Sequence, residues 1–346
     1  MSKIEDLLNR TVRQDNKANR WVVIVAIAIV SCVAIGSLLC AIYFADVDGY
    51  LQKNKPIIGV YDFYDQKVGE NETAVFFFGS SLVGDLMYPI EINRLVKMNY
   101  PNITSYNLNI GGEIPIERTL EIQKIIDAKP SLVIFGVTYR SASDFMNNAR
   151  LFDRTKPVAS RLNLRSDSLW LYTKDEMRYF TPMSLFEKKK YLFSAIEYKL
   201  SEHTSAGSFD KFGESLGPVE SLTQDEVIEW VFKNRSFRFN VTSERTRYKD
   251  ALIYNVKTLQ NAGIPVIIIN MPLHPLLSEK ITDESRANFY DLLNETGAVW
   301  YDFERDYDGS YFKDGVHANF DGALEFAPRM ADLIIEQVEK DVIHYT

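Results

Sequence analysis

Five short segments of strand-like composition, most of them strongly apolar, limit the possible folds of this chain more than any other feature. They are residues 74–78, 105–110, 132–135, 264–269 and 299–303, each followed by glycine or a polar residue. Apolar residues at helical spacing predict helices at 82–98, 116–128, 243–262, 284–296 and 321–340. Strands that alternate with helices form parallel βαβ units with helices on both faces of the sheet. The sequence therefore predicts a three-layer α/β/α domain around a five-stranded parallel sheet.

The alternation is interrupted between about residues 141 and 242. Residues 140–200 hold 12 Lys or Arg against 7 Asp or Glu, together with many aromatic residues. We predict an insertion of mostly helices and loops, in which Thr223–Glu226 forms a capping box at the start of one helix. Two interpretations stay open for the basic, aromatic part. It is a lid or docking surface for an acidic glycan or membrane partner, or it is an ordinary solvated helical layer.

A second constraint comes from residues 21–45, which form 25 consecutive positions without a charge. As a helix this run is about 37 Å long, enough to cross a bilayer with some tilt. It predicts a cytoplasmic tail at 1–20, a transmembrane helix at 21–45, a stalk at 46–70 and an extracytoplasmic domain at 71–346.

The charges beside the run predict its orientation in the cell membrane. Five Lys or Arg lie among residues 1–20, and Asp46 and Asp48 follow the run. The positive-inside rule therefore predicts a single-pass protein with a cytoplasmic N-terminus. Two alternatives are a cleaved signal peptide, whose apolar core would normally be shorter, and a lipoprotein modified at Cys32.

Composition excludes other classes of function. The net charge of −8 argues against a general nucleic-acid binder. The only cysteines, Cys32 and Cys40, lie inside the uncharged run, so the rest of the chain has no thiolate for zinc or catalysis and no disulfide. We expect no metal and no cofactor.

Three motifs follow predicted strands and carry candidate chemistry. Gly79-Ser80-Ser81 places a serine on a sharp strand-to-helix turn, residues 107–112 end in two glycines, and Asp314-x-x-His317 precedes the last helix. A nucleophilic serine needs a base, and the base needs a carboxylate that fixes its tautomer. His317 is the favoured base, and His274, which follows another strand, is its rival. Ligand sites in open α/β sheets lie at the carboxyl ends of strands, where all three motifs fall.

With these motifs the chain resembles the SGNH (GDSL-like) hydrolase superfamily over residues 74–140 and 250–335. The resemblance implies a flavodoxin-like fold, with Ser81 as nucleophile and Ser80 where the family has Asp. It implies that Asp314 and His317 complete the catalytic set and that the N–H groups of Ser81 and Gly112 hold the oxyanion. Asn319 and Gly322 also match the family's final block.

The third block departs from the family, because Gly136-Val137-Thr138-Tyr139 has Thr138 where the family has an oxyanion-binding Asn. The Thr138 hydroxyl can also donate, although its side chain is shorter, so Thr138 is the third candidate oxyanion residue. Loss of one such donor typically costs on the order of 10²–10³ in rate. Membrane-anchored relatives with Gly-Ser-Ser, such as DltD-like and alginate-acetylation proteins, move acyl groups onto surface polymers beside a membrane-bound O-acyltransferase. The resemblance thus implies a serine O-acyltransferase or esterase, with the bilayer, such an acyltransferase and a surface glycopolymer or acyl ester as partners.

One alternative belongs to another class of function. A non-catalytic glycan-binding or scaffold protein of the cell surface could retain the same fold. The altered third block favours this alternative, whereas the Ser81, Asp314 and His317 set argues against it.

Overall fold

The computed structural model describes residues 20–37, 60–61, 63–64, 72–143, 155–182, 184, 187, 226, 229 and 239–343. They belong to two units that are described separately: one contains the N-terminal helix together with residues 184 and 187, and the other is the α/β domain.

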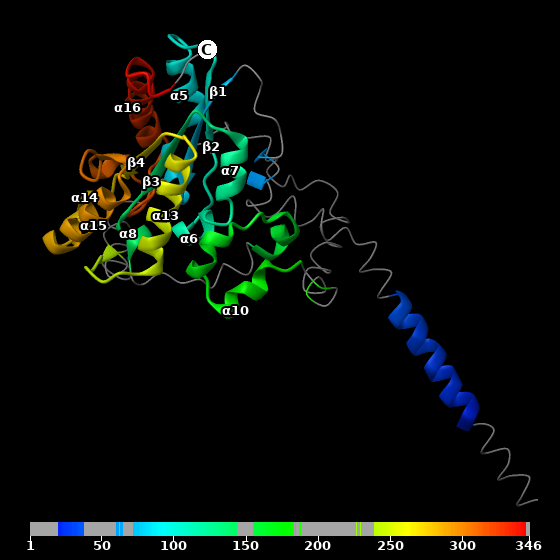
Figure 1. The fold of residues 1–346 in the computed structure, drawn as a ribbon. Coiled ribbons are helices and arrows are strands. Elements are labelled where there is room, and N and C mark those ends of the chain that lie inside the picture. Colours follow the sequence, from blue (N-terminus) through cyan, green and yellow to red (C-terminus); the bar gives the residue numbers. More distant parts are fainter. Residues whose placement is uncertain are drawn as a thin grey trace, which may run out of the picture. The chain divides into compact units, whose positions relative to one another are not determined.

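A five-stranded sheet forms the centre of the α/β domain (Figure 1). Every pair of neighbouring strands is parallel, and the order is β2-β1-β3-β4-β5. This is the flavodoxin-like order, so the predicted fold class is confirmed. The direction of strand addition reverses between β1 and β3, which is where such sheets bind ligands. The strands are β1 (Thr73–Gly79), β2 (Ile103–Asn107), β3 (Leu132–Val137), β4 (Val266–Asn270) and β5 (Val299–Asp302).

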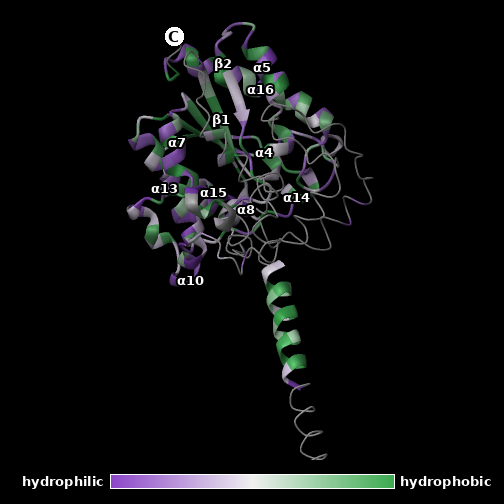
Figure 2. Cartoon of the chain, turned by 90° about the vertical axis from the view of Figure 1, so that its right-hand side faces the viewer, coloured by the Kyte–Doolittle hydropathy of each residue, from purple (hydrophilic) through white to green (hydrophobic). Residues whose placement is uncertain are grey.

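Helices cover both faces of the sheet, as Figure 2 shows with the sheet between α5 and α16 on one side and α7 and α13 on the other. Strands enclosed in this way are apolar along their whole length, and β1 and β3 are accordingly buried almost throughout. One layer contains α4 (Ser81–Leu86), α5 (Pro89–Val96) and α16 (Phe320–Glu339). The other contains α6 (Pro115–Arg118), α7 (Ile122–Ala128), α13 (Arg247–Asn261) and α15 (Asp283–Thr296). The short helices α8 (Tyr139–Ala142) and α14 (Pro275–Ser278) follow β3 and β4.

Two predicted helices are each divided in the structure. The helix expected at 82–98 ends at Leu86, and α5 begins at Pro89. Proline lacks an N–H and disfavours helical backbone in the residue before it, so it starts a new helix. The helix expected at 116–128 is likewise split into α6 and α7.

Other boundaries move by a few residues. The strand β2 lies at 103–107 where 105–110 was predicted, although the N–H groups of Leu108 and Ile110 still donate to β1 carbonyls at 2.9 and 3.0 Å. The helix α13 begins at Arg247, four residues later than predicted, because the side chain of Thr246 caps it.

The predicted insertion is described only in part. Residues 155–182 contain short 3₁₀ helices at Lys156–Arg161, Ser166–Leu171 and Arg178–Phe180, and α10 (Lys174–Met177). The helix predicted from the capping box at Thr223 lies outside the described residues, apart from two helical positions at 226 and 229.

The N-terminal helix is described over Arg20–Ser37 and has a mean hydropathy of 2.2. Figure 2 colours it as apolar along nearly its whole length. It is long and apolar enough to cross a bilayer, a property that signal sequences share. Residues 38–45 of the predicted span lie outside the described part of the chain.

Part of the predicted stalk packs into the α/β domain. Val60, Tyr61 and Tyr64 are buried there, with Tyr61 fully enclosed. The Tyr64 hydroxyl donates to Glu121 Oε2 at 3.1 Å and accepts from Arg118 Nη1 at 3.2 Å. These residues belong to the packed α/β domain. The N-terminal boundary of this domain therefore lies before residue 71, where the sequence predicted it.

Arg118 is the centre of a buried ionic cluster. Its guanidinium, with no exposed side-chain surface, donates to the carboxylates of Glu113 and Glu121 and, at 3.1 Å, to the carbonyl of Leu108. Burial raises the pKa of Glu121 to about 7, an effect that the charge of Arg118 opposes. Arg118 thus joins the residues near position 64 to the segment that follows β2.

Replacing Arg118 with Met should destabilise the domain by about 3–5 kcal/mol, because it leaves buried carboxylates without their cation. Urea unfolding of the purified protein measures this change. Arg94→Met is the matched control, since Arg94 pairs with Glu91 on the surface, and it should leave the free energy of unfolding nearly unchanged. Equal losses in the two variants would contradict the central role of Arg118.

Candidate active site

The carboxyl end of β1 is shaped by two glycines that face each other. Gly79 of β1 pairs with Gly136 of β3. A Cβ atom at Gly79 would lie 2.5 Å from the Gly136 carbonyl oxygen, and one at Gly136 would lie 2.2 Å from Val83 Cγ2. Gly79 also has a φ of +149°, which favours glycine. Only glycine at both positions lets α4 approach the sheet and start immediately after β1.

Ser81 is the first residue of α4, and its side chain meets His317. Ser81 Oγ lies 2.8 Å from His317 Nε2, and His317 Nδ1 lies 2.7 Å from Asp314 Oδ2. Because the carboxylate only accepts, it holds the imidazole proton on Nδ1 and leaves Nε2 able to accept from the serine. The structure therefore brings together three side chains that the sequence analysis selected, with Ser81 rather than Ser80 facing the histidine.

The loop that carries Asp314 and His317 is held by its own hydrogen bonds. Asp314 Oδ1 accepts the backbone N–H groups of Val316 and His317, each at 2.8 Å. Asn319 caps α16 by accepting the Gly322 N–H at 2.9 Å, and its Nδ2 donates to the Ser310 carbonyl. Asn319 and Gly322 thus fix the end of the loop that follows His317.

The same hydrogen bonds set the charge state of Asp314. Burial alone would raise the pKa of its carboxyl, but the hydrogen bonds from His317 and from two backbone N–H groups outweigh burial. The pKa of Asp314 therefore lies below its ordinary value, and Asp314 is ionised at neutral pH, as the orientation of His317 requires.

His274, the rival base, has a different role. Its Nδ1 accepts the Leu276 N–H at 3.2 Å and so caps α14. The ring is 4% exposed and packs against Phe312 and Gly309, and burial lowers its pKa. Because Ser81 Oγ contacts His317, the candidate base is His317 and not His274.

The three residues expected to bind an oxyanion all follow strands at this end of the sheet. Gly112 has a φ of +71° in a turn where the Glu113 N–H donates to the Ile110 carbonyl at 2.8 Å. Within the described part of the chain, the N–H groups of Ser81 and Gly112 donate to no protein acceptor. Thr138 is buried, and its N–H donates to Ser141 Oγ at 3.3 Å, so only its hydroxyl could serve as an additional donor.

Two positioning contacts were missed by the sequence analysis. Asn107 Nδ2 donates to the carbonyls of Val83 and Met87 at 3.0 and 2.8 Å, which ties the end of β2 to α4. Asp85 of α4 pairs with Lys313 at 3.0 Å, and both side chains are mostly buried. The motif 107–112 contains Asn107, but nothing local in the sequence indicates that Asp85 meets Lys313.

Among the described residues, no group of three or more His, Cys, Asp or Glu is arranged to hold a metal ion. The chemistry that the site offers is deprotonation of Ser81 by His317, with the backbone N–H of Ser81 at the start of α4 available to stabilise negative charge.

Comparisons with known proteins find one family model and several similar solved structures. One family model, which carries no functional description, matches residues 224–339, about a third of the chain. No curated protein matches the sequence. A protein described as an acylhydrolase from Bacteroides fragilis is similar in structure, with 13% identity and a TM-score of 0.37, over 86% of this chain and 98% of its own.

Two further solved structures are similar. A GDSL-like lipase from Bacteroides thetaiotaomicron has 12% identity and a TM-score of 0.35, over 86% of this chain and 99% of its own. A gut microbial diltiazem-metabolizing enzyme has 11% identity and a TM-score of 0.32, over 78% of this chain and 48% of its own. These likenesses are weak, so the fold class rests on the strand order of the sheet.

Asp314→Asn should make the protein less stable at pH 7, and the difference from wild type should shrink in acid. The pKa of the Asp314 carboxyl is lower in the folded protein than in the unfolded chain, where it has its ordinary value of about 3.9. The ionised carboxylate therefore stabilises the folded protein above this ordinary value, and the stabilisation is lost as the pH falls through the pKa of the folded protein. Denaturant unfolding at pH 7, 5 and 3 measures the difference. Asp332→Asn, which removes an exposed carboxylate, is the control and should show little change. If the free energy of unfolding of Asp314→Asn differs from that of wild type by the same amount at all three pH values, the lowered pKa assigned to Asp314 is wrong.

Proposed function

We propose that this chain is a membrane-anchored serine acyl-transfer enzyme, an O-acyltransferase or esterase of the SGNH type. The observation that carries the proposal is the continuous line from Ser81 through His317 to Asp314, with heavy-atom distances of 2.8 and 2.7 Å. Both distances are short enough for proton transfer and for orientation of the imidazole.

The mechanism follows from the positions of these atoms. His317 Nε2 takes the proton of Ser81 as Oγ attacks the ester carbonyl, and Asp314 stabilises the imidazolium that forms. The N–H groups of Ser81 and Gly112 hold the oxyanion, with the Thr138 hydroxyl as third donor. As the intermediate collapses, the C–O bond to the leaving alcohol breaks and His317 protonates that alcohol. The acyl group then passes from Ser81 to water or to a sugar hydroxyl.

The proposed location and partners rest on the N-terminal helix and on the resemblance to surface-polymer acylation proteins. The helix has basic residues before it and acidic residues after it, which favours a cytoplasmic N-terminus and an extracytoplasmic catalytic domain. In that position Ser81 has access to surface polysaccharide, and a membrane-bound O-acyltransferase is the proposed partner that exchanges acyl groups with it.

A non-catalytic glycan-binding or scaffold role is the second candidate. The observation that favours it is Thr138, whose N–H is occupied by Ser141 and whose side chain is shorter than the family's Asn. A protein of this kind would have no need for a serine that reacts with electrophiles, so the reactivity of Ser81 separates the two candidates.

A fluorophosphonate probe should label the wild-type protein and Ser80→Ala but not Ser81→Ala. The adjacent serine is the matched control, because only Ser81 Oγ lies beside His317. In-gel fluorescence and mass spectrometry of the labelled peptide measure the result. A folded wild-type protein that takes up no probe would exclude the proposed enzyme and favour the binding protein.

His317→Asn should slow this labelling by about 10²–10⁴-fold, since the general base is lost. His274→Asn should label at close to the wild-type rate, because an Asn side chain can also accept the Leu276 N–H and cap α14. The second-order rate constants of labelling at pH 7.5 provide the comparison. Equal rates in the two variants would show that His317 is not the base.

A further inference from the structure

A buried ion pair crosses from the helix that carries Ser81 to the loop that carries His317. Asp85 lies one turn after Ser81 on α4, so the two side chains lie on the same face of this helix. Asp85 Oδ2 is 3.0 Å from Nζ of Lys313, which immediately precedes Asp314. The pair therefore joins the nucleophile side of the site to the base side, in addition to the contact between Ser81 and His317.

The backbone of the loop fixes Lys313 relative to His317. The Lys313 N–H donates to the His317 carbonyl at 2.9 Å, and the Asn319 N–H donates to the Tyr311 carbonyl at 2.9 Å. An antiparallel bridge lies between these two bonds and closes the stretch into a hairpin. A contact that holds the Lys313 side chain therefore also holds the imidazole of His317.

The pair lies where water screens charges weakly. The side chains of Asp85 and Lys313 are only 9% and 19% exposed. Burial raises the pKa of the Asp85 carboxyl, and the hydrogen bond and the charge of Lys313 oppose this rise. The charges of His317 and Asp314 also act on Asp85, which places the four groups in one electrostatic cluster. A change of charge at either partner of the pair therefore changes the potential at the imidazole.

The other titratable groups around His317 differ from this pair. Asp314 is already bound to the imidazole at Nδ1. His274 follows β4, and because burial lowers its pKa the ring is uncharged at neutral pH. Asp321, in the first turn of α16, is exposed to solvent. The ion pair between α4 and the loop thus adds two largely buried charges that the mechanism above does not use.

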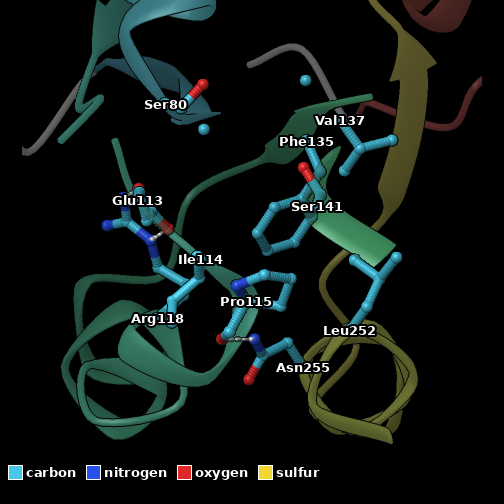
Figure 3. A pocket seen from close by; sticks show the side chains of 12 residues that line it. Ser80, Glu113, Ile114, Pro115, Arg118, Phe135, Val137, Ser141, Leu252 and Asn255 are labelled. Carbon is cyan, nitrogen blue, oxygen red and sulfur yellow. Dashed lines mark hydrogen bonds and ion pairs between the residues drawn. The ribbon is translucent and has the colours of Figure 1, made fainter. Parts of the chain in front are cut away.

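A second ion pair near the site belongs to a different cluster. Figure 3 draws Glu113 beside Arg118, in the segment that follows β2. Arg118 also binds Glu121, so its charge is balanced within that cluster. That cluster holds the segment before Gly112, whereas the ion pair of Asp85 is attached to the loop of the base.

On the basis of the proposed serine acyl-transfer function, we propose that Asp85 and Lys313 are positioning residues that set the charge balance at His317. The carboxylate of Asp85 stabilises the imidazolium that forms when His317 takes the proton of Ser81. The ammonium of Lys313 offsets this effect, so that the imidazole is uncharged and able to accept the proton when the substrate arrives. Asp85 and Lys313 keep their own protonation states, and the proton moves only from Ser81 to His317 and then to the leaving alcohol.

The test is the pH dependence of fluorophosphonate labelling, measured as second-order rate constants on the full-length protein in detergent from pH 5 to 9. The rate rises with pH as the imidazole loses its proton, and the midpoint of this rise does not depend on how much of the protein is folded. Asp85→Asn removes a negative charge and makes the imidazolium less favourable, so the midpoint should move to lower pH. Lys313→Gln removes a positive charge and should move the midpoint to higher pH. Each shift should be about half a pH unit, as expected for one partly screened charge.

Three further variants separate charge from packing. Lys313→Arg keeps the charge and should keep the wild-type midpoint, even where its rate is lower. Glu91→Gln removes a carboxylate from the surface pair with Arg94 on the neighbouring helix α5, and it should also keep the midpoint. The double variant Asp85→Asn/Lys313→Gln removes both charges and should return the midpoint to near its wild-type position.

The single variants decide the outcome. Asn at position 85 keeps the size of the side chain and still accepts a hydrogen bond from Lys313, so this variant is designed to fold. If either single variant keeps the wild-type midpoint, or if both move it in the same direction, the pair is only a structural contact and the proposal is overturned, while labelling of Ser81 still supports the proposed function. A folded wild-type protein that takes up no probe would overturn the proposed function itself, and this proposal with it.

Discussion

The close approach of β1, β3 and α4 is the constraint on which the rest of the site depends. Gly79 and Gly136 face each other at the carboxyl ends of neighbouring strands, and Val83 packs against both. A side chain at either glycine would push α4 away from the sheet, and Ser81 would move with it. One packing contact therefore determines where the serine points.

Contacts between distant parts of the sequence then hold the surrounding loops. Lys313 and Asp85 join the loop of Asp314 and His317 to the helix that begins with Ser81. Arg118 joins Tyr64 to the carbonyl of Leu108, in the segment that leads to Gly112. Through the second contact, Tyr64 of the predicted stalk packs against the cluster that holds the segment before Gly112. Tyr64 therefore belongs to the same packed domain as Ser81 and His317.

The sequence predicts the sheet and the Ser81, His317 and Asp314 set because short, local sequence patterns mark both. Apolar runs that end in glycine mark β1 and β3, and Asp314 and His317 lie three residues apart on one loop. The breaks at Pro89 and between α6 and α7 were missed because apolar spacing continues across them, although the proline itself was a signal. The pairing of Asp85 with Lys313 and the burial of Tyr61 depend on the tertiary fold and leave no local pattern.

The partial exposure of the histidine and its carboxylate bears on what the acyl acceptor of the proposed enzyme is. The side chains of His317 and Asp314 keep 21% and 19% of their surface exposed. In the proposed enzyme the leaving alcohol takes the proton from His317 on this open side, and the acceptor hydroxyl then gives its own proton to His317. A hydroxyl of a large polymer can therefore approach acyl-Ser81 as water does, and the choice between transfer and hydrolysis depends on which of the two is held beside His317.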